Sequence, residues 1–128
     1  WQDLATAEGA ASAEAAALVD DDAFASVDLS ARAALIWAAS SESPLTAYTL
    51  TCGEAVERAP SAWVLEASFD GAETWHLLDE RSGETFDWPA QIRPFAVASP
   101  PAGTQPSATH YRLTFPGGGQ LSQIELLA

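Results

Sequence analysis

The sequence predicts an all-β fold, an antiparallel β-sandwich built by one domain over residues 1–128. Short segments alternate apolar and polar residues with a period of two, which is typical of half-buried strands. Clusters of Gly, Pro, Ser and Asp separate these segments at regular spacing and indicate turns. A chain of 128 residues that is 48% hydrophobic is large enough to bury the core of one domain. No internal repeat and no interdomain linker interrupts this pattern.

The N-terminal third is expected to contain a helical segment, an acidic turn and two strands. Residues 1–17 are rich in Ala and favour a short helix. As an alternative, residues 1–15 form the junction with a preceding domain. The segment 18–28 is acidic and predicts a turn. Strands are predicted over residues 34–40 and 45–51, where apolar side chains either run continuously or alternate with Thr and Tyr.

A polar loop over residues 52–62, closed by Pro60, leads into the clearest strand pair of the chain. The first strand of this pair places on one face Trp63, Leu65, Ala67 and Phe69. Asp70-Gly71 predicts a two-residue hairpin turn, because Gly adopts positive φ at no steric cost. Trp75 follows near the start of the second strand, and we expect both Trp63 and Trp75 in the core.

The C-terminal third is predicted to supply the remaining strands. A Ser-Gly turn at residues 82–83 precedes a strand whose inward side chains are Ile92, Phe95 and Val97. Residues 99–108 are rich in Pro and Ser and predict a loop. Alternation over 109–115 predicts another strand, and a last strand starts at Leu121. The chain has one cysteine, Cys52, so no intrachain disulfide can form, and we expect this residue to be a buried or half-buried strand residue.

The composition is strongly acidic and restricts the classes of partner. Eighteen acidic residues against 5 basic ones, all of them Arg, give a net charge of −13. Such a charge repels nucleic acid and anionic membranes, and it suits a neutral ligand or a cation. The alternative explanation is that the negative charge only keeps the protein soluble and indicates no ligand. No apolar run reaches the length needed to cross a bilayer. We therefore expect neither nucleic acid nor a membrane as a partner.

The strand pair resembles the central hairpin of discoidin-like (coagulation factor V/VIII type C) domains. The residues that carry this resemblance are Trp63, Leu65, Glu66, Ser68, Asp70, Gly71, Trp75, Leu78, Asp79 and Arg81. Further matches are Arg58 and Pro60 before the hairpin, Tyr111-Arg112-Leu113, and the final strand with Leu121, Ser122, Ile124, Glu125 and Leu126. The resemblance covers roughly residues 16–128, and within the family it is greatest to bacterial family 32 carbohydrate-binding modules appended to secreted glycoside hydrolases.

This resemblance implies a galactose-binding-like jelly roll without catalytic activity. The expected function is to hold a secreted or cell-surface bacterial glycoside hydrolase near a glycan, with galactosides, mannosides and glucans as candidate ligands and a catalytic domain in the same polypeptide. The alternative is a structural, interdomain module that binds no sugar itself. No carboxylate pair beside an aromatic cleft is recognisable in the sequence, so we do not expect an enzyme.

The candidate sugar site lies in two loops that follow strands of the same direction, residues 52–62 and 80–93, and should therefore meet at one end of the sandwich. The expected ligand-binding residues are Glu54, Glu57, Arg58, Trp88 and Gln91. An indole can stack on the apolar face of a pyranose, and a guanidinium can donate to vicinal hydroxyls. The alternatives are a salt bridge of Arg58 to Glu54 or Glu57, and a buried Trp88 that fills the core beneath its loop.

The resemblance also implies a structural Ca²⁺, which in this family is bound by an acidic turn and by a Glu of the last strand. The matching residues are Asp20, Asp22, Ser26 and Glu125. Ca²⁺ requires several oxygen ligands, and carboxylates with a hydroxyl can supply them. The alternative is that the run of Asp residues is a solvated turn that binds no metal.

Overall fold

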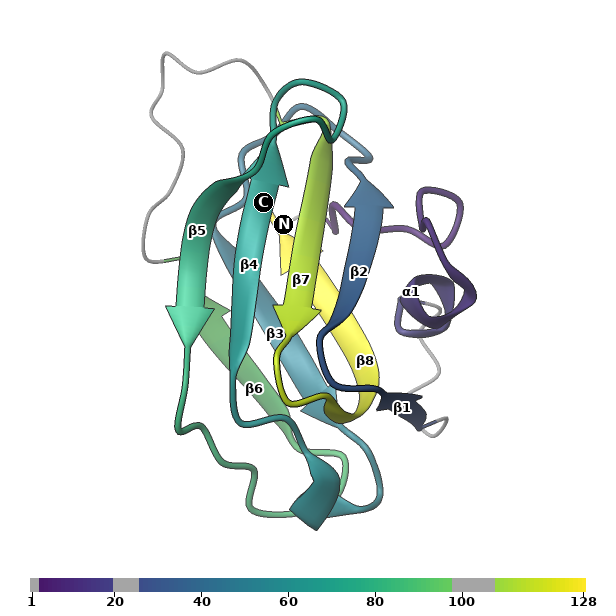
Figure 1. The fold of residues 1–128 in the computed structure, drawn as a ribbon, viewed down its shortest axis with the longest axis vertical. Coiled ribbons are helices and arrows are strands. Elements are labelled where there is room, and N and C mark those ends of the chain that lie inside the picture. The colour runs from purple at the N-terminus through teal and green to yellow at the C-terminus, as the bar shows by residue number, and fades with distance from the viewer. Residues whose placement is uncertain (1–2, 20–25, 98–107) are drawn as a thin grey trace.

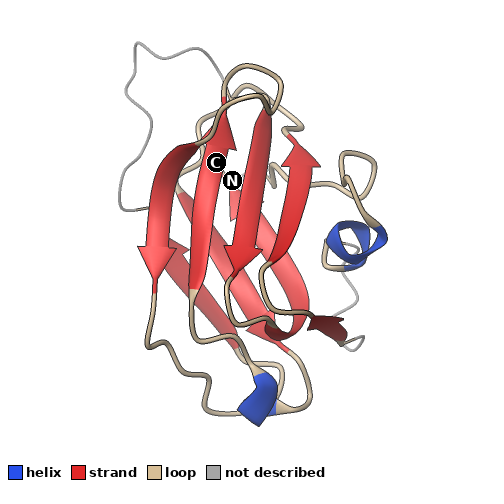
Figure 2. Ribbon diagram, in the orientation of Figure 1, coloured by secondary structure: helices blue, strands red, loops and turns tan. Residues whose placement is uncertain are grey.

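The computed structural model describes residues 3–19, 26–97 and 108–128, in which eight strands form two four-stranded antiparallel sheets packed face to face (Figures 1 and 2). The elements are α1 (Ala13–Ala17), β1 (Val27–Leu29), β2 (Ala33–Ala38), β3 (Ala47–Cys52), the 3₁₀ helix η1 (Val56–Arg58), β4 (Trp63–Ser68), β5 (His76–Arg81), β6 (Ile92–Ala96), β7 (His110–Phe115) and β8 (Gly119–Leu127). One sheet has the order β1-β8-β3-β6 and the other β2-β7-β4-β5. The predicted all-β sandwich is confirmed.

The predicted strands appear close to their expected positions as β2, β3, β7 and β8. Strand β1 was not predicted, because its three residues are too few to show an alternating pattern. It forms by pairing with β8, where Val27 faces Leu121 and Leu29 faces Gly119. Of the helix expected within residues 1–17, the structure shows only the single turn α1, over Ala13–Ala17. No helix in the described ranges is long and apolar enough to cross a membrane.

The core lies between the two sheets and is rich in aromatic side chains. Trp63 is fully buried and meets Phe95 edge to face, with the ring centroids 5.1 Å apart. Trp37 is also fully buried, and its indole N–H donates to the Ala15 carbonyl of α1 at 2.9 Å. Cys52 is buried, as predicted.

A polar cluster is buried within this apolar core. The Tyr48 hydroxyl donates to Asp79 Oδ2, and it accepts from the Trp63 indole N–H at 2.8 Å. Arg81 Nε donates to the same Asp79 oxygen at 2.9 Å. Burial and the neighbouring Asp79 raise the pKa of Tyr48 above its ordinary value. The cluster satisfies each of these groups, which buried polar atoms require.

The hairpin between β4 and β5 differs from its prediction. Residues 69–75 connect the strands, so the two-residue turn predicted at Asp70-Gly71 is wrong. The Asp70 carboxylate accepts from the Thr74 amide at 2.9 Å and from Ser68 Oγ at 2.7 Å, and these bonds stabilise a wider loop. Hydrogen bonds from Thr74 and Ser68 hold the pKa of Asp70 well below its usual range. A side chain that bonds its own loop can override the local turn signal.

The expectation that Trp75 lies in the core is also wrong. Trp75 is half-buried, and the Arg112 guanidinium lies 4.3 Å from the centroid of its ring. Arg112 in turn donates to Glu66 at 2.8 and 3.0 Å. Trp75 precedes β5 and belongs to the loop, so the alternation of the strand does not fix the direction of its side chain.

In strand β6 and the residue after it, two of the three side chains expected to point inward are buried and one is exposed. Phe95 and Val97 are buried as predicted, but Ile92 is 61% exposed. Ile92 and Phe95 are three residues apart, so in an extended strand they point to opposite faces. Arg93 takes the inward position, with its guanidinium 5.0 Å from the Phe95 ring centroid. Its cation stacks on the edge of the core, and Ile92 faces outward.

Candidate functional site

The two predicted loops do meet at one end of the sandwich. Their contact consists of backbone bonds: the Cys52 amide donates to the Gln91 carbonyl at 3.1 Å, and the Ala90 amide donates to the Gly53 carbonyl at 3.3 Å. The Cys52 thiol lies 3.2 Å from the Trp88 carbonyl. These contacts fix the loop that carries Trp88 against the end of β3.

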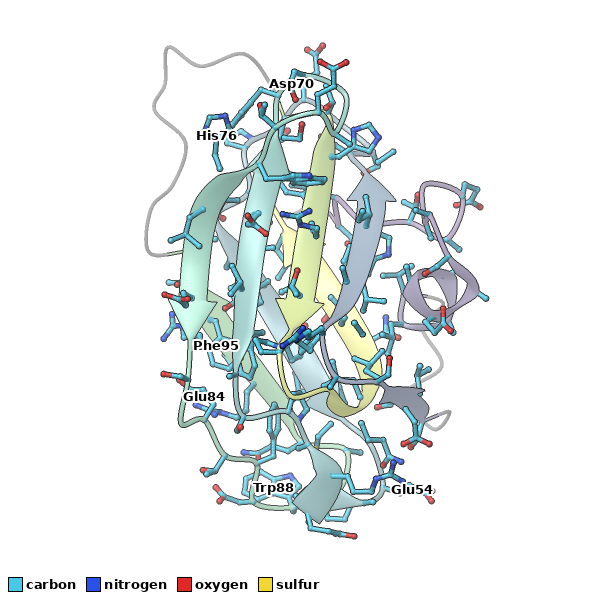
Figure 3. The ribbon with its side chains drawn as sticks, in the orientation of Figure 1. Glu54, Asp70, His76, Glu84, Trp88 and Phe95 are labelled. Carbon is cyan, nitrogen blue, oxygen red and sulfur yellow. The ribbon has the colours of Figure 1, made fainter. Side chains whose placement is uncertain are left out.

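Trp88 is exposed at this end of the molecule (Figure 3). Its side chain is 57% exposed, so the alternative prediction, that Trp88 fills the core beneath its loop, is wrong. Asp87 and Pro89 on either side are exposed as well. The Asp87 amide donates to Gln91 Oε1 at 2.7 Å, and this hydrogen bond spans the short loop that contains Trp88. The predicted residue Gln91 therefore supports the loop, and Trp88 is the large apolar surface that it presents.

Arg58 lies on η1 in the other loop and is held by a partner that the sequence did not reveal. Its guanidinium is 3.0 Å from Asp28 Oδ1, so the predicted alternative partners Glu54 and Glu57 are wrong. Both side chains of this ion pair are more than half exposed. Glu54 and Glu57 are themselves exposed, on the same loop as Arg58. The predicted loop thus keeps two carboxylates available to solvent beside a tethered guanidinium.

A small network anchors the η1 loop to strands β1 and β8. Gln120 donates to Asp28 at 3.0 Å through Nε2, and its Oε1 accepts from the Ala55 amide at 2.9 Å. A Cβ added to Gly53 would lie 2.4 Å from Gln120 Oε1, so this glycine lets the Gln120 side chain reach the loop. Sequence reasoning missed Asp28 and Gln120, because their pairing depends on the register of β1 against β8, where they lie opposite one another.

Beside the η1 loop lies a shallow polar depression of about 370 Å³. It is lined by Glu57, Arg58 and Pro60 of the loop and by the turn Gly117–Gly119. Trp88 is not among its described lining residues. The predicted site residues therefore lie at one end of the sandwich but form two separate features. One is the exposed indole of Trp88, and the other is the depression that contains the Arg58 guanidinium.

The predicted calcium ligands lie partly outside the described residues, since Asp20 and Asp22 belong to the segment 20–25. Ser26 Oγ accepts from the Glu54 amide at 3.2 Å, and Glu125 Oε1 accepts from Thr49 Oγ1 at 2.9 Å. Within residues 3–19, 26–97 and 108–128, no group of three His, Cys, Asp or Glu side chains is placed to hold a metal. The calcium site depends on Asp20 and Asp22 and stays a prediction.

Comparison with known sequences gives one partial match. No protein-family model matches the chain. A stretch of 57 residues is 37% identical to peptide-N(4)-(N-acetyl-beta-glucosaminyl)asparagine amidase of Arabidopsis thaliana. This stretch covers 44% of the present chain and 8% of the plant protein. The chain thus spans only a small part of this relative, whose activity as a whole protein does not transfer to it.

Comparison with solved structures is more extensive. Chitosan-binding module 1 from a chitosanase/glucanase of Paenibacillus sp. IK-5 superposes with a TM-score of 0.68 at 16% identity over 100% of both chains. A family 32 carbohydrate-binding module of Clostridium perfringens, in complex with GalNAc-β-1,3-galactose, gives 0.62 at 12% identity and covers 89% of this chain and 83% of that one. An F5/8 type C domain of Bacteroides fragilis gives 0.61 at 16% identity, with 86% and 77% covered. The chain has the discoidin-like β-sandwich fold of these domains, as predicted.

Proposed function

We propose that this domain is a non-catalytic carbohydrate-binding module, attached to a secreted or cell-surface bacterial glycoside hydrolase that it holds near a glycan. The observation that carries the proposal is the exposed indole of Trp88, mounted on a loop that hydrogen bonds hold in place. A Trp side chain that is more than half exposed leaves a large apolar surface in water. An exposed indole held in place in this way can stack against the apolar face of a ligand.

The chemistry of the loop end suits a sugar ring. The indole face can stack against the apolar C–H face of a pyranose, which gives affinity with little requirement for one particular sugar. Arg58 offers N–H donors in a fixed geometry for hydroxyl groups. Its ion pair with Asp28 restricts the guanidinium before any ligand binds, and this lowers the entropy cost of binding.

The neighbours with known ligands support the same class of function. The module of Clostridium perfringens was solved with GalNAc-β-1,3-galactose, and a second family 32 module from that organism was solved with galactose. The family 32 module of a different protein, AlyQ, was solved with 4,5-unsaturated mannuronic acid. The Paenibacillus module derives from a chitosanase/glucanase. Sites differ among proteins of one fold, so these ligands indicate a class of molecule, and the residues of this chain must define the sugar.

The position of the chain ends is compatible with a tethered module. Asp3 pairs with Leu127 in an isolated bridge, and the C-terminus lies away from the loop that carries Trp88 (Figures 1 and 3). A catalytic domain joined at either end would leave Trp88 accessible to a glycan. The competing function, an interdomain module without sugar binding, is favoured by the exposed side chains of Leu77 (53%) and Ile92 (61%).

A titration of the domain against galactosides, mannosides and glucans by calorimetry and affinity electrophoresis separates these two functions. We expect a dissociation constant of about 0.1–1 mM for at least one glycan, because a shallow site buries little ligand surface. Trp88→Ala and Arg58→Ala should each weaken binding at least fivefold or so, whereas the control Leu77→Ala should not. Absence of binding to every glycan, or binding that both loop variants leave unchanged, would contradict the proposal.

A further inference from the structure

We propose that Asp70-Gly71 is a latent site of isoaspartate formation, and that Thr74 and Thr109 hold this reaction off while the loop between β4 and β5 keeps its hydrogen bonds. An Asp followed by Gly is prone to the reaction, because Gly has no Cβ to hinder its own amide nitrogen. The chain contains no Asn, and Asp70 is its one Asp that precedes Gly. Asp70 lies at the opposite end of the molecule from Trp88, so the inference does not depend on the proposed function (Figure 3).

The reaction needs no partner other than water. The backbone nitrogen of Gly71 attacks Cγ of Asp70 and forms an N–Cγ bond, while the hydroxyl of the protonated carboxyl group and the amide hydrogen leave together as water. The cyclic succinimide is then hydrolysed. Water that adds at Cγ restores Asp70, whereas water that adds at the α-carbonyl carbon breaks its bond to the Gly71 nitrogen. The second product is isoaspartate, which has the mass of Asp and carries one more methylene group in the backbone.

Hydrogen bonds restrain the carboxyl group that must react. Asp70 Oδ1 accepts from the Thr74 amide at 2.9 Å and from Ser68 Oγ at 2.7 Å, and Asp70 Oδ2 accepts from Thr74 Oγ1. Both oxygens are therefore held, and Cγ cannot rotate freely toward the Gly71 nitrogen. The same bonds hold the pKa of Asp70 well below its usual range, so the carboxyl group rarely carries the proton that the departing hydroxyl needs.

The attacking nitrogen is restrained by a residue from another part of the chain. The Gly71 N–H donates to Thr109 Oγ1 at 3.0 Å, and Thr109 directly precedes β7. The Thr109 amide donates in turn to the Ser68 carbonyl at 2.8 Å, and Thr109 Oγ1 lies 3.2 Å from the same oxygen. The nucleophile is thus tied to the start of β7, and the carboxyl group that it would attack is tied within its own loop.

These hydrogen bonds, and not burial, protect the site, because Asp70, Gly71, Thr74 and Thr109 are all exposed. An exposed loop opens locally more often than the whole domain unfolds. Isoaspartate should therefore form through local opening of the loop, at a rate that Thr74 and Thr109 control. The global stability of the domain should have little influence on this rate.

The test measures isoaspartate during incubation of the full chain at mildly acidic pH, well below its melting temperature. Trypsin releases residues 59–81, since Arg58 and Arg81 flank this segment, and liquid chromatography separates the isomers. Protein isoaspartate methyltransferase then labels the new α-carboxylate. We expect the folded domain to form isoaspartate at least tenfold or so more slowly than the chain unfolded in guanidinium chloride.

Two variants remove one restraint each. Thr109→Val removes the acceptor of the Gly71 N–H, and Thr74→Val removes the hydroxyl that bonds Asp70 Oδ2. Each should speed isoaspartate formation in the folded domain by about twofold to tenfold, which corresponds to the loss of one hydrogen bond. Melting curves confirm that both variants are folded.

Two controls separate this local effect from others. Thr85→Val makes the same change at an exposed threonine outside the loop. Tyr48→Phe removes a hydroxyl bonded to Asp79 and Trp63 in the core and leaves the loop unchanged. Both controls should form isoaspartate at the wild-type rate.

Three results would overturn the proposal. The first is a folded wild-type domain that forms isoaspartate as fast as the unfolded chain. The second is a rate in Thr109→Val and Thr74→Val that equals the wild-type rate, or that Tyr48→Phe or Thr85→Val matches. The third is an unfolded chain in which no isoaspartate forms at Asp70.

Discussion

Replacing Tyr48 with Phe removes a single hydroxyl from the centre of the core and tests the role of the buried polar cluster. In the wild-type protein this hydroxyl donates to Asp79 and accepts from the Trp63 indole N–H at 2.8 Å. Asp79 keeps its bond from Arg81 in the variant, at 2.9 Å. Trp63 is fully buried, so no water replaces the lost acceptor.

The expected cost follows from the two bonds. A hydrogen bond to a charged group contributes about 1.5–3 kcal/mol, and leaving a buried donor such as the Trp63 N–H without a partner costs about 1–3 kcal/mol. Together the variant should lower the free energy of unfolding by about 3–5 kcal/mol. For a domain of this size the melting temperature should fall by roughly 10–20 °C.

Urea unfolding followed by tryptophan fluorescence measures this loss, and Tyr111→Phe is a matched control. Tyr111 is equally buried, but its hydroxyl bonds the backbone of Leu45 and no charged group, so its removal should cost only about 1 kcal/mol. If Tyr48→Phe destabilised the protein no more than Tyr111→Phe does, the buried polar cluster would not stabilise the core as stated.

Burial also raises the pKa of both Tyr48 and Tyr111 above the ordinary value of 10.0. The tyrosines of the unfolded chain therefore lose their protons first as the pH rises. The free energy of unfolding should fall above about pH 10, by up to ~1.4 kcal/mol per pH unit for each tyrosine. A free energy of unfolding that stays constant between about pH 9 and 11 would contradict this. Asp28→Asn should weaken glycan binding severalfold by releasing Arg58, with little loss of stability, because their ion pair is exposed and contributes only about 0–1 kcal/mol; unchanged affinity in calorimetry would show that the tether has no role. If the predicted calcium site forms, millimolar Ca²⁺ should raise the melting temperature of the wild type and not of Glu125→Gln, and an unchanged wild-type value would argue against the site.

Much of the fold was predictable because its strands have complete alternating patterns. Tyr111, Leu113 and Phe115 alternate with polar residues, and all three are buried in β7. The meeting of the two loops was predictable as well, since it follows from the direction of the preceding strands. Local side-chain direction was harder to predict, as Trp75 and Ile92 show. The direction of Trp75 depends on where the loop ends and β5 begins, which a pattern of single residues defines only within a few positions. Ile92 lies three residues from the buried Phe95, so the alternation of β6 turns it outward although it is apolar.

The partners within the candidate site could not be read from the sequence. Arg58 is closer in the chain to Glu54 and Glu57 than to Asp28, yet it pairs with Asp28. That contact depends on the pairing of β1 with β8, which brings Gln120 opposite Asp28. Contacts between residues so distant in the chain are set by the packing of the whole domain.

The most direct test of the binding site is a nitrogen-15 NMR titration of the domain with a glycan that it binds. We expect the indole N–H signal of Trp88 and the amide signals of residues 53–58, 84–88, 90 and 91 to shift together, while the indole signals of Trp37 and Trp63 stay unchanged. Shifts that cluster instead around Trp75 and Arg112, at the sheet that contains β7, would contradict the proposed binding site at Trp88.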